Sequence, residues 1–285
     1  MSYLVTGAAG QLGRTFVRRL QHEGRRLTPC TRAELDLTDH DAVLAIVDRE
    51  QPTVILNCAA YNAVDAAEDD APGALAVNAF GVHSLARAAR HVGATLVHYS
   101  TDFVFDGEAD RPYREEDEAN PRSVYGQSKL LGEWLAADAP RAFVVRVESL
   151  FGGPAARSSI DRIIDALATG RPARVFTDRT VSPSYVEDVV EATLALLSCE
   201  ATPGLYHCVN GGSATWLELA LSTAELLGAE PHLEPVRLQD VALKAPRPRY
   251  CALSNERLAT AGIVMPPWQD ALARYLRGRA GGLTA

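Results

Sequence analysis

The sequence predicts an α/β fold, a Rossmann-type doubly wound parallel sheet with a smaller C-terminal region. A β-rich segment at residues 3–6 leads directly into a glycine-rich turn and a helical pattern. Further short apolar segments at 54–57, 94–100 and 142–147 are separated by stretches long enough for helices, and after residue 153 this alternation loosens and prolines multiply. Continuous apolar strands that alternate with helices are typical of a parallel sheet covered on both faces.

The first turn of the chain carries three glycines in the spacing G-x-x-G-x-x-G, namely Gly7, Gly10 and Gly13. The turn follows a strand and opens a helix at Gln11 and Leu12. In this arrangement a dinucleotide pyrophosphate can approach the backbone and lie at the positive end of the helix. The pattern predicts a dinucleotide site, with a tight turn that holds no ligand as the alternative.

The end of the second expected strand, 26–30, bears on the choice of cofactor. A site for NAD places Asp or Glu here, where the carboxylate accepts a hydrogen bond from the ribose 2′-hydroxyl. No acid stands there, and Arg32 can instead meet a 2′-phosphate, so we expect NADPH, with NADH and a merely solvated Arg32 as alternatives. After the third expected strand, small residues let a cofactor lie close to the backbone, in the segment Cys58, Ala59, Ala60 and Tyr61.

Hydroxyl groups and a lysine gather around the fourth expected strand and the helix that follows. Ser100 and Thr101 end that strand, at the edge where open α/β sheets place their ligands. Tyr125 and Lys129 are four residues apart, so on a helix their side chains share one face. A nearby ammonium favours the ionised form of a phenol, so we expect Lys129 to lower the pKa of Tyr125 towards the range of efficient acid catalysis. An ordinary polar pair at the start of a helix has the same spacing.

The set Thr101, Tyr125 and Lys129 resembles the catalytic residues of the short-chain dehydrogenase/reductases. The segment Ser-Thr-Asp-Phe-Val-Phe-Asp-Gly at 100–107 is similar to that of the extended dTDP-4-dehydrorhamnose reductase family. This resemblance covers nearly the whole chain and implies NADPH-dependent reduction of the C4 ketone of a 4-keto-6-deoxy sugar nucleotide. Tyr125 would protonate the oxygen, Lys129 would bind the cofactor ribose, and Thr101 would orient the ketone.

The resemblance also implies domains and further site residues. Residues 1–152 would form the NAD(P)-binding Rossmann domain and 153–285 mainly the substrate-binding region, some of whose segments return to the Rossmann domain. It implies contacts of Asp36, Leu37 and Asn78 with the cofactor. For the substrate it implies a set of five residues, Val64, Asp102, Phe103, Ser149 and Arg247.

Two positions depart from related patterns. Ser149 stands where the family has Trp, and Phe103 stands where the related dehydratases have the second acid of a pair, which disfavours elimination. A sugar-nucleotide epimerase or dehydratase on the same scaffold remains an alternative. So does a non-enzymatic regulatory subunit that binds NADP and a partner enzyme, although the intact Thr101, Tyr125 and Lys129 argue against that role.

The composition, with 47% hydrophobic and 22% charged residues, is that of an ordinary soluble globular protein, and the net charge of −8 argues against nucleic-acid binding. The five cysteines lack C-x-x-C spacing, which indicates a reducing compartment without disulfides. With no leader-like or membrane-spanning segment, we expect a cytoplasmic protein without membrane contact. The oligomeric state stays open, and a homodimer is among the states that the sequence allows.

The histidines have no metal-ligand spacing, so no metal is expected, although the many carboxylates leave an oxygen-liganded magnesium ion open. Two acidic stretches, 65–70 and 115–118, are interpreted as solvated surface. The polar segment 108–120, which precedes Tyr125, is expected to be a mobile loop.

Overall fold

The computed structural model of the chain describes residues 1–154, 158–199 and 201–281. At its centre lies a six-stranded sheet in the order β10-β5-β4-β3-β1-β2, in which all neighbouring strands are parallel. The predicted doubly wound sheet is therefore confirmed. The strand order reverses at β1, the point at which open α/β sheets bind ligands. The strands are β1 (Ser2–Thr6), β2 (Arg26–Cys30), β3 (Val54–Asn57), β4 (Thr95–Thr101), β5 (Ala142–Val147) and β10 (Gly204–His207).

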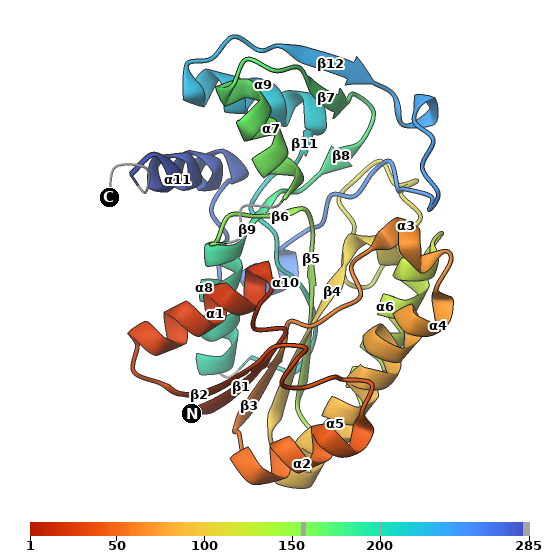
Figure 1. The fold of residues 1–285 in the computed structure, drawn as a ribbon, viewed down its shortest axis with the longest axis vertical. Coiled ribbons are helices and arrows are strands. Elements are labelled where there is room, and N and C mark those ends of the chain that lie inside the picture. The colour runs from red at the N-terminus through yellow and green to blue at the C-terminus, as the bar shows by residue number, and fades with distance from the viewer. Residues whose placement is uncertain (155–157, 200, 282–285) are drawn as a thin grey trace.

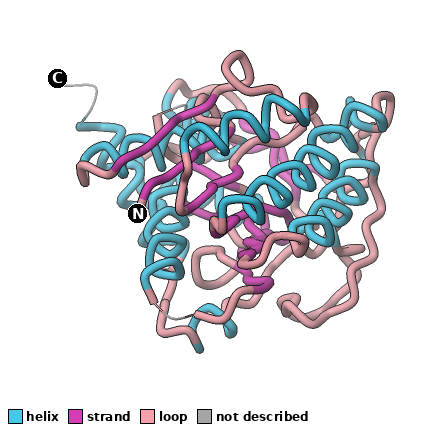
Figure 2. Tube along the Cα trace, turned by 90° about the horizontal axis from the view of Figure 1, so that it is seen from below, coloured by secondary structure: helices cyan, strands magenta, loops and turns pink. Residues whose placement is uncertain are grey.

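Helices cover both faces of this sheet (Figures 1 and 2). One face carries α1 (Gln11–His22) and α8 (Val186–Ser198), which also pack against each other. The other face carries α2 (His40–Glu50), α5 (Gly81–Val92) and α6 (Val124–Ala136). The chain after residue 153 thus returns to the sheet, among other places with α8 and with the edge strand β10.

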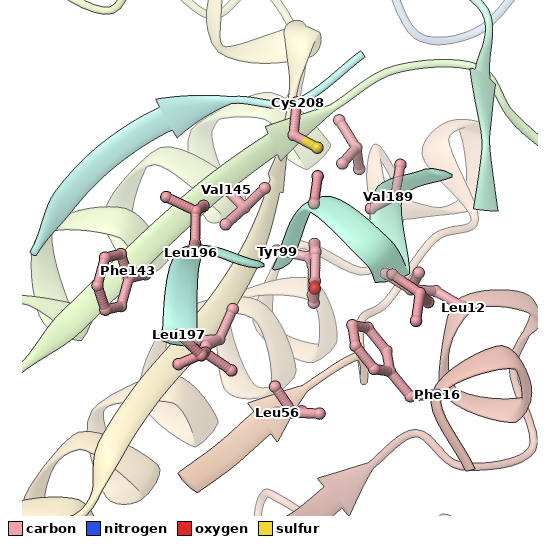
Figure 3. Close-up of a cluster of buried hydrophobic side chains, with 14 of the residues drawn as sticks. Leu12, Phe16, Leu56, Tyr99, Phe143, Val145, Val189, Leu196, Leu197 and Cys208 are labelled. Carbon is pink, nitrogen blue, oxygen red and sulfur yellow. The ribbon is translucent and has the colours of Figure 1, made fainter. Parts of the chain in front are cut away.

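The continuous apolar strands are explained by the two buried faces, because successive side chains of a strand point to opposite sides. Leu56 packs with Phe16 in the cluster beneath α1 and α8 (Figure 3), whereas its neighbour Ile55 packs beneath α2 and α5. All three side chains are fully buried.

Short helical segments connect the strands near the predicted site. After β3 the chain forms α3 (Val64–Ala67), α4 (Ala71–Leu75) and the π-helical turn η1 (Ala76–Phe80), which continues into α5. After β4 it forms the 3₁₀ turn η2 (Asp102–Val104).

A second assembly lies beyond the carboxyl ends of the strands, in the upper part of Figure 1. Its helices share a separate apolar core, to which Ile160, Trp216 and Leu272 contribute. The helices are α7 (Ser159–Ala168), α9 (Trp216–Leu227) and α11 (Trp268–Gly281). Three short two-stranded sheets pair β7 (Ala173–Phe176) with β12 (Leu233–Val236), β8 (Thr180–Val181) with β11 (Ala214–Thr215), and β6 (Leu150–Phe151) with β9 (Ser184–Tyr185). The remaining short helices are η3 (Leu238–Asp240) and α10 (Glu256–Thr260).

The segment 108–120, expected to be a mobile loop, is anchored to the body of the protein. Tyr113 is buried, stacks on Phe105 at 4.0 Å between ring centroids, and its N–H donates to the carbonyl of Ala252 at 2.8 Å. The segment is a loop, as predicted, but partners distant in sequence hold its centre in place. In the part of the chain that the structure describes, no helix has the length and apolarity to cross a membrane.

Candidate active site

The glycine turn after β1 is shaped by close backbone contacts. Gly7 has φ +63°, and a Cβ there would lie 2.6 Å from the nitrogen of Ala59. A Cβ on Gly13 would lie 2.2 Å from the carbonyl oxygen of Gly7, so Gly13 lets α1 pack onto the turn. Gly10 is the N-cap of α1 and brings no side chain over the helix end. The turn therefore leaves its backbone accessible next to a helix N-terminus, as a pyrophosphate requires.

A cavity of about 270 Å³ lies beside this turn and gathers the residues predicted for the adenosine end of a cofactor. Asp36 accepts hydrogen bonds from the backbone N–H and the hydroxyl of Thr38, and these bonds lower the pKa of its carboxyl. Burial raises the pKa of the Cys58 thiol, which favours its protonated form. The predicted residues that line the cavity are Gly7, Gly10, Arg32, Asp36, Leu37, Cys58, Ala59, Ala60 and Tyr61.

A second cavity, of about 370 Å³, contains the predicted catalytic residues. Thr101 is the last residue of β4, while Tyr125 and Lys129 lie in the first turns of α6. This helix begins at a cap in which the Ser123 hydroxyl accepts from the N–H of Gly126 at 3.1 Å. The cavity is also lined by Gly10, Gln11 and Leu12, so the glycine turn and the three catalytic candidates share one space.

The hydroxyl of Tyr125 is held in a buried environment. Burial raises the pKa of Tyr125, and a hydrogen bond with Thr101 lowers it by less. The expected lowering of this pKa by Lys129 is therefore wrong for the protein alone, because loss of solvent dominates. A protonated phenol is nevertheless the form that an acid needs in order to donate a proton.

Asn78 lies in the π-helical turn η1 and links two parts of the site. Its side-chain oxygen accepts from the N–H of Tyr61 at 2.8 Å, and its nitrogen donates to the hydroxyl of Ser128 at 2.9 Å. It lines neither of the two cavities. Asn78 thus holds the segment after β3 against α6, and its position is that of a supporting residue.

The five residues predicted to bind the substrate do not all line the same cavity. The larger set, Val64, Asp102, Phe103 and Ser149, lines the 370 Å³ cavity. Arg247 instead forms an ion pair with Asp65 at 2.7 Å and lines a separate cavity of about 720 Å³. That pair also shows that the acidic stretch 65–70 is not wholly solvated.

Sequence reasoning missed several residues of the 370 Å³ cavity, because they come from segments far apart in the chain. Glu148 follows β5, Arg179 precedes β8, and Trp216 begins α9. Arg179, Trp216 and Ser159 also line an adjoining cavity of about 380 Å³. That cavity is further lined by Arg162, Arg174 and Phe176.

Asp102, Glu148 and Cys251 form a buried group in which one ligand-type atom of each lies within 4.8 Å of the others. Burial raises the pKa of Glu148 well above its usual range, and the neighbouring Asp102 raises it further. Burial also raises the pKa of Asp102, while the guanidinium of Arg179 lowers it.

Comparisons with known proteins match this chain over nearly its whole length. A dTDP-4-dehydrorhamnose reductase of Streptomyces griseus is 39% identical over 98% of this chain and 95% of its own length. A dTDP-4-keto-6-deoxy-D-glucose reductase of Streptomyces niveus is 36% identical over 95% of each chain. The crystal structure of dTDP-4-dehydrorhamnose reductase from Bacillus anthracis in complex with NADP is 31% identical, covers 98% of this chain and 100% of that chain, and has a TM-score of 0.93.

The match to a family model is equally extensive. The model for the RmlD substrate binding domain matches residues 1–280, and the predicted resemblance to dTDP-4-dehydrorhamnose reductases is confirmed. The chain belongs to the RmlD substrate binding domain family.

Proposed function

We propose that this chain is an NADPH-dependent reductase of the C4 ketone of a 4-keto-6-deoxy sugar nucleotide. The observation that carries this proposal is the single 370 Å³ cavity lined both by the glycine turn and by Thr101, Tyr125 and Lys129. A cofactor laid along the turn and a carbonyl held by the two hydroxyls would meet in this space. The names of the relatives, which are reductases of 4-keto sugar nucleotides, support the same substrate class.

The residues of the cavity divide the reaction among them. NADPH, when bound, supplies a hydride to C4 of the sugar. The hydroxyls of Thr101 and Tyr125 bind the ketone oxygen, and Tyr125 gives its proton to that oxygen as negative charge develops. Lys129 holds the ribose of the cofactor and provides a positive charge beside the phenolate that remains.

The preference for NADPH rests on the end of β2. Arg32 and Asp36 line the 270 Å³ cavity. Neither Asp nor Glu stands at the end of β2, where Cys30 is followed by Thr31 and Arg32. A guanidinium can bind a 2′-phosphate through charge-assisted hydrogen bonds, whereas it gains less from a ribose hydroxyl.

The nucleotide part of the substrate would occupy the adjoining 380 Å³ cavity. This cavity shares three lining residues with the 370 Å³ cavity, namely Ser159, Arg179 and Trp216. Two further cationic side chains, Arg162 and Arg174, also line it. Guanidinium groups suit a diphosphate, and an aromatic wall suits a base. Under this assignment residues 1–152 bind the cofactor and 153–285 mainly bind the substrate.

Oxidation of NADPH on mixing with dTDP-4-keto-6-deoxyglucose or dTDP-4-dehydrorhamnose tests the proposal directly. We expect turnover that depends on both the protein and the keto sugar, with NADH oxidised more slowly. Binding of NADPH without oxidation in the presence of any 4-keto sugar nucleotide would contradict the reductase function and favour a regulatory subunit. Release of water or change of a sugar stereocentre without net oxidation of NADPH would favour a dehydratase or an epimerase.

A further inference from the structure

Two buried carboxyl groups lie side by side in the catalytic cavity, although they are far apart in sequence. Asp102 directly follows β4 and Glu148 directly follows β5, and these strands are paired so that Thr101 lies opposite Val147. The two side chains are 3% and 2% exposed. The pairing of β4 with β5 therefore creates an acid pair next to Thr101.

Each carboxyl group uses only one of its oxygens within the protein. Oδ1 of Asp102 accepts from the Thr101 hydroxyl at 2.9 Å, and Oε2 of Glu148 accepts from the N–H of Ser182 at 2.6 Å. Oδ2 of Asp102 and Oε1 of Glu148 are buried without a hydrogen-bond partner, and both residues line the cavity. A buried carboxyl oxygen without a partner is costly, and because both residues line the cavity, a ligand bound there can supply the missing partner.

The charges around the pair determine which ligand fits. One cation, Arg179, faces the two acids, and it is held by a hydrogen bond from its Nε to the carbonyl of Pro248 at 3.2 Å. Two carboxylates this close do not both ionise easily, so one cation and one shared proton balance the group. A pair that shares one proton offers both a donor and an acceptor, and a hydroxyl group requires both.

We propose that Asp102 and Glu148 together bind the C3 hydroxyl of the sugar, and that Glu148 is a specificity-determining residue. This inference rests on the proposed function, in which Thr101 and Tyr125 hold the oxygen at C4. Asp102 is hydrogen-bonded to Thr101, so the pair lies beside the ketone. Of the two ring carbons that flank C4 in a 4-keto-6-deoxy sugar, C3 carries a hydroxyl and C5 carries a methyl group. Of these two positions, only C3 offers a hydroxyl to the free oxygens of the pair.

A metal ion is the alternative ligand, since Asp102, Glu148 and Cys251 offer three ligand-type atoms. Arg179 already supplies a positive charge at this point, and its Nη2 donates to Sγ of Cys251 at 3.7 Å. The thiol sulfur is thus already in contact with a cationic side chain. The group therefore matches a sugar hydroxyl better than a divalent cation.

The test is the kcat/KM for dTDP-4-keto-6-deoxyglucose and for its 3-deoxy and 2-deoxy analogues. These values are measured in the wild type, in Glu148→Ala and in Glu148→Gln. Glu115→Gln is the matched control, because Glu115 also accepts from a backbone N–H, that of His207 at 2.8 Å, but lies outside the cavity. Circular dichroism and NADPH titration establish that each variant is folded.

We expect the wild type to prefer the 3-hydroxylated sugar over the 3-deoxy analogue by about 100-fold or more, since a site built for a hydroxyl rejects analogues that lack it. Glu148→Ala should reduce this ratio below about 10-fold, and Glu148→Gln should retain part of it because an amide also donates and accepts. The ratio for the 2-deoxy analogue should stay constant in all variants, and Glu115→Gln should match the wild type.

A wild type that is active but reduces the 3-deoxy analogue equally well overturns this inference alone, whether or not the variants fold. A folded Glu148→Ala that keeps the full ratio overturns it too. So does activity that is lost with EDTA and restored by Zn²⁺ or Mg²⁺, because that result assigns the carboxyl pair to a cation. A wild type that reduces no 4-keto sugar nucleotide overturns the proposed function and this inference with it.

Discussion

The side-chain nitrogen of Lys129 lies 2.5 Å from the carbonyl oxygen of Tyr99 and 3.5 Å from Nε2 of His98. Nδ2 of Asn57 lies 3.0 Å from Nδ1 of His98, while Oδ1 of Asn57 accepts from the Thr6 hydroxyl. This network assigns the Asn57 amide as the donor and Nδ1 of His98 as the acceptor. Burial lowers the pKa of Lys129 to about 8. The ammonium of Lys129, which we propose holds the cofactor ribose, therefore loses its proton more readily than that of an exposed lysine.

Replacing Lys129 with Met should change how stability depends on pH. The pKa of Lys129 is about 8 in the folded protein and 10.5 for an unperturbed lysine, so between these pH values the unfolded wild type binds more protons than the folded one. The wild type therefore gains stability as pH rises through this window, by up to about 3 kcal/mol, whereas the variant lacks this gain. The measurement is the free energy of unfolding of both proteins in urea, over pH values from below 8 to above 10.5. Parallel curves of stability against pH for the two proteins would show that folding does not shift the pKa of Lys129.

Replacing Tyr125 with Phe should abolish proton donation while preserving the fold. The ring of Tyr125 packs edge-on against Phe103 with centroids 5.5 Å apart, and Phe retains this contact. We expect turnover to fall by about 100-fold or more, with NADPH binding unchanged. Tyr250→Phe, which removes a phenol outside the 370 Å³ cavity, serves as the control. Near wild-type turnover in Tyr125→Phe would assign the proton to another group.

Replacing Arg32 with Ala should weaken NADPH binding more than NADH binding. Arg32 lines the 270 Å³ cavity, and only NADPH carries the 2′-phosphate that its guanidinium can bind. Fluorescence titration of the wild type and the variant with both cofactors gives the four dissociation constants. Arg14→Ala removes a charge that lies outside this cavity and is the matched control. An equal loss for both cofactors, or a wild type that prefers NADH, would contradict the predicted preference.

The buried ion pair between Glu133 and Arg146 fixes α6 to β5, and α6 carries Tyr125 and Lys129. Nε and Nη2 of Arg146 donate to the two carboxylate oxygens at 2.8 and 2.7 Å, and the side chains are 3% and 6% exposed for Arg146 and Glu133. Removing one partner leaves the other as an unpaired buried charge, so Glu133→Ala should lower the free energy of unfolding by about 3 to 5 kcal/mol. Glu133→Leu combined with Arg146→Met should lower it by much less. Equal losses in the single and double variants would show that packing, rather than the charge, determines the cost.

The grouping of Thr101, Tyr125 and Lys129 in one cavity could be predicted because its geometry is local. The spacing between Tyr125 and Lys129 fixes their common helical face, and the apolar strand that ends at Thr101 fixes its edge of the sheet. The same reasoning correctly predicted the doubly wound sheet, because continuous apolar strands require two covered faces.

The residues that sequence reasoning missed depend on contacts between distant segments. Phe103 stands in the place where dehydratases have a second acid, yet Glu148 brings a second carboxyl beside Asp102 through the pairing of β4 with β5. The stretch 115–118 was interpreted as solvated, but Glu115 is half-buried and accepts from the N–H of His207. Neither contact can be recognised in the local sequence, because the tertiary fold brings together residues from distant parts of the chain.

Ser149 stands where the family has Trp, and its backbone has an unusual conformation. Its φ is 42°, in the left-handed region of backbone conformation that residues other than Gly and Asn rarely adopt. The residue lines the 370 Å³ cavity, in which the aromatic side chains of Phe103 and Trp216 form other parts of the wall. A Ser at this position leaves open the space that the large flat ring of a Trp would fill.

We expect the wild type to accept a broader range of 4-keto-6-deoxy sugar nucleotides than relatives with Trp at this position, and Ser149→Trp to narrow that range. A hydrophobic wall discriminates by about 1 to 3 kcal/mol per missing group, so the preference should change by about 10-fold or more. The measurement is kcat/KM for dTDP-4-dehydrorhamnose against other 4-keto-6-deoxy sugar nucleotides. Ser149→Ala, which keeps Cβ and removes only the hydroxyl, separates the effect of bulk from that of hydrogen bonding. If the wild type already prefers dTDP-4-dehydrorhamnose strongly and Ser149→Trp leaves that preference unchanged, residue 149 has no part in selecting the sugar.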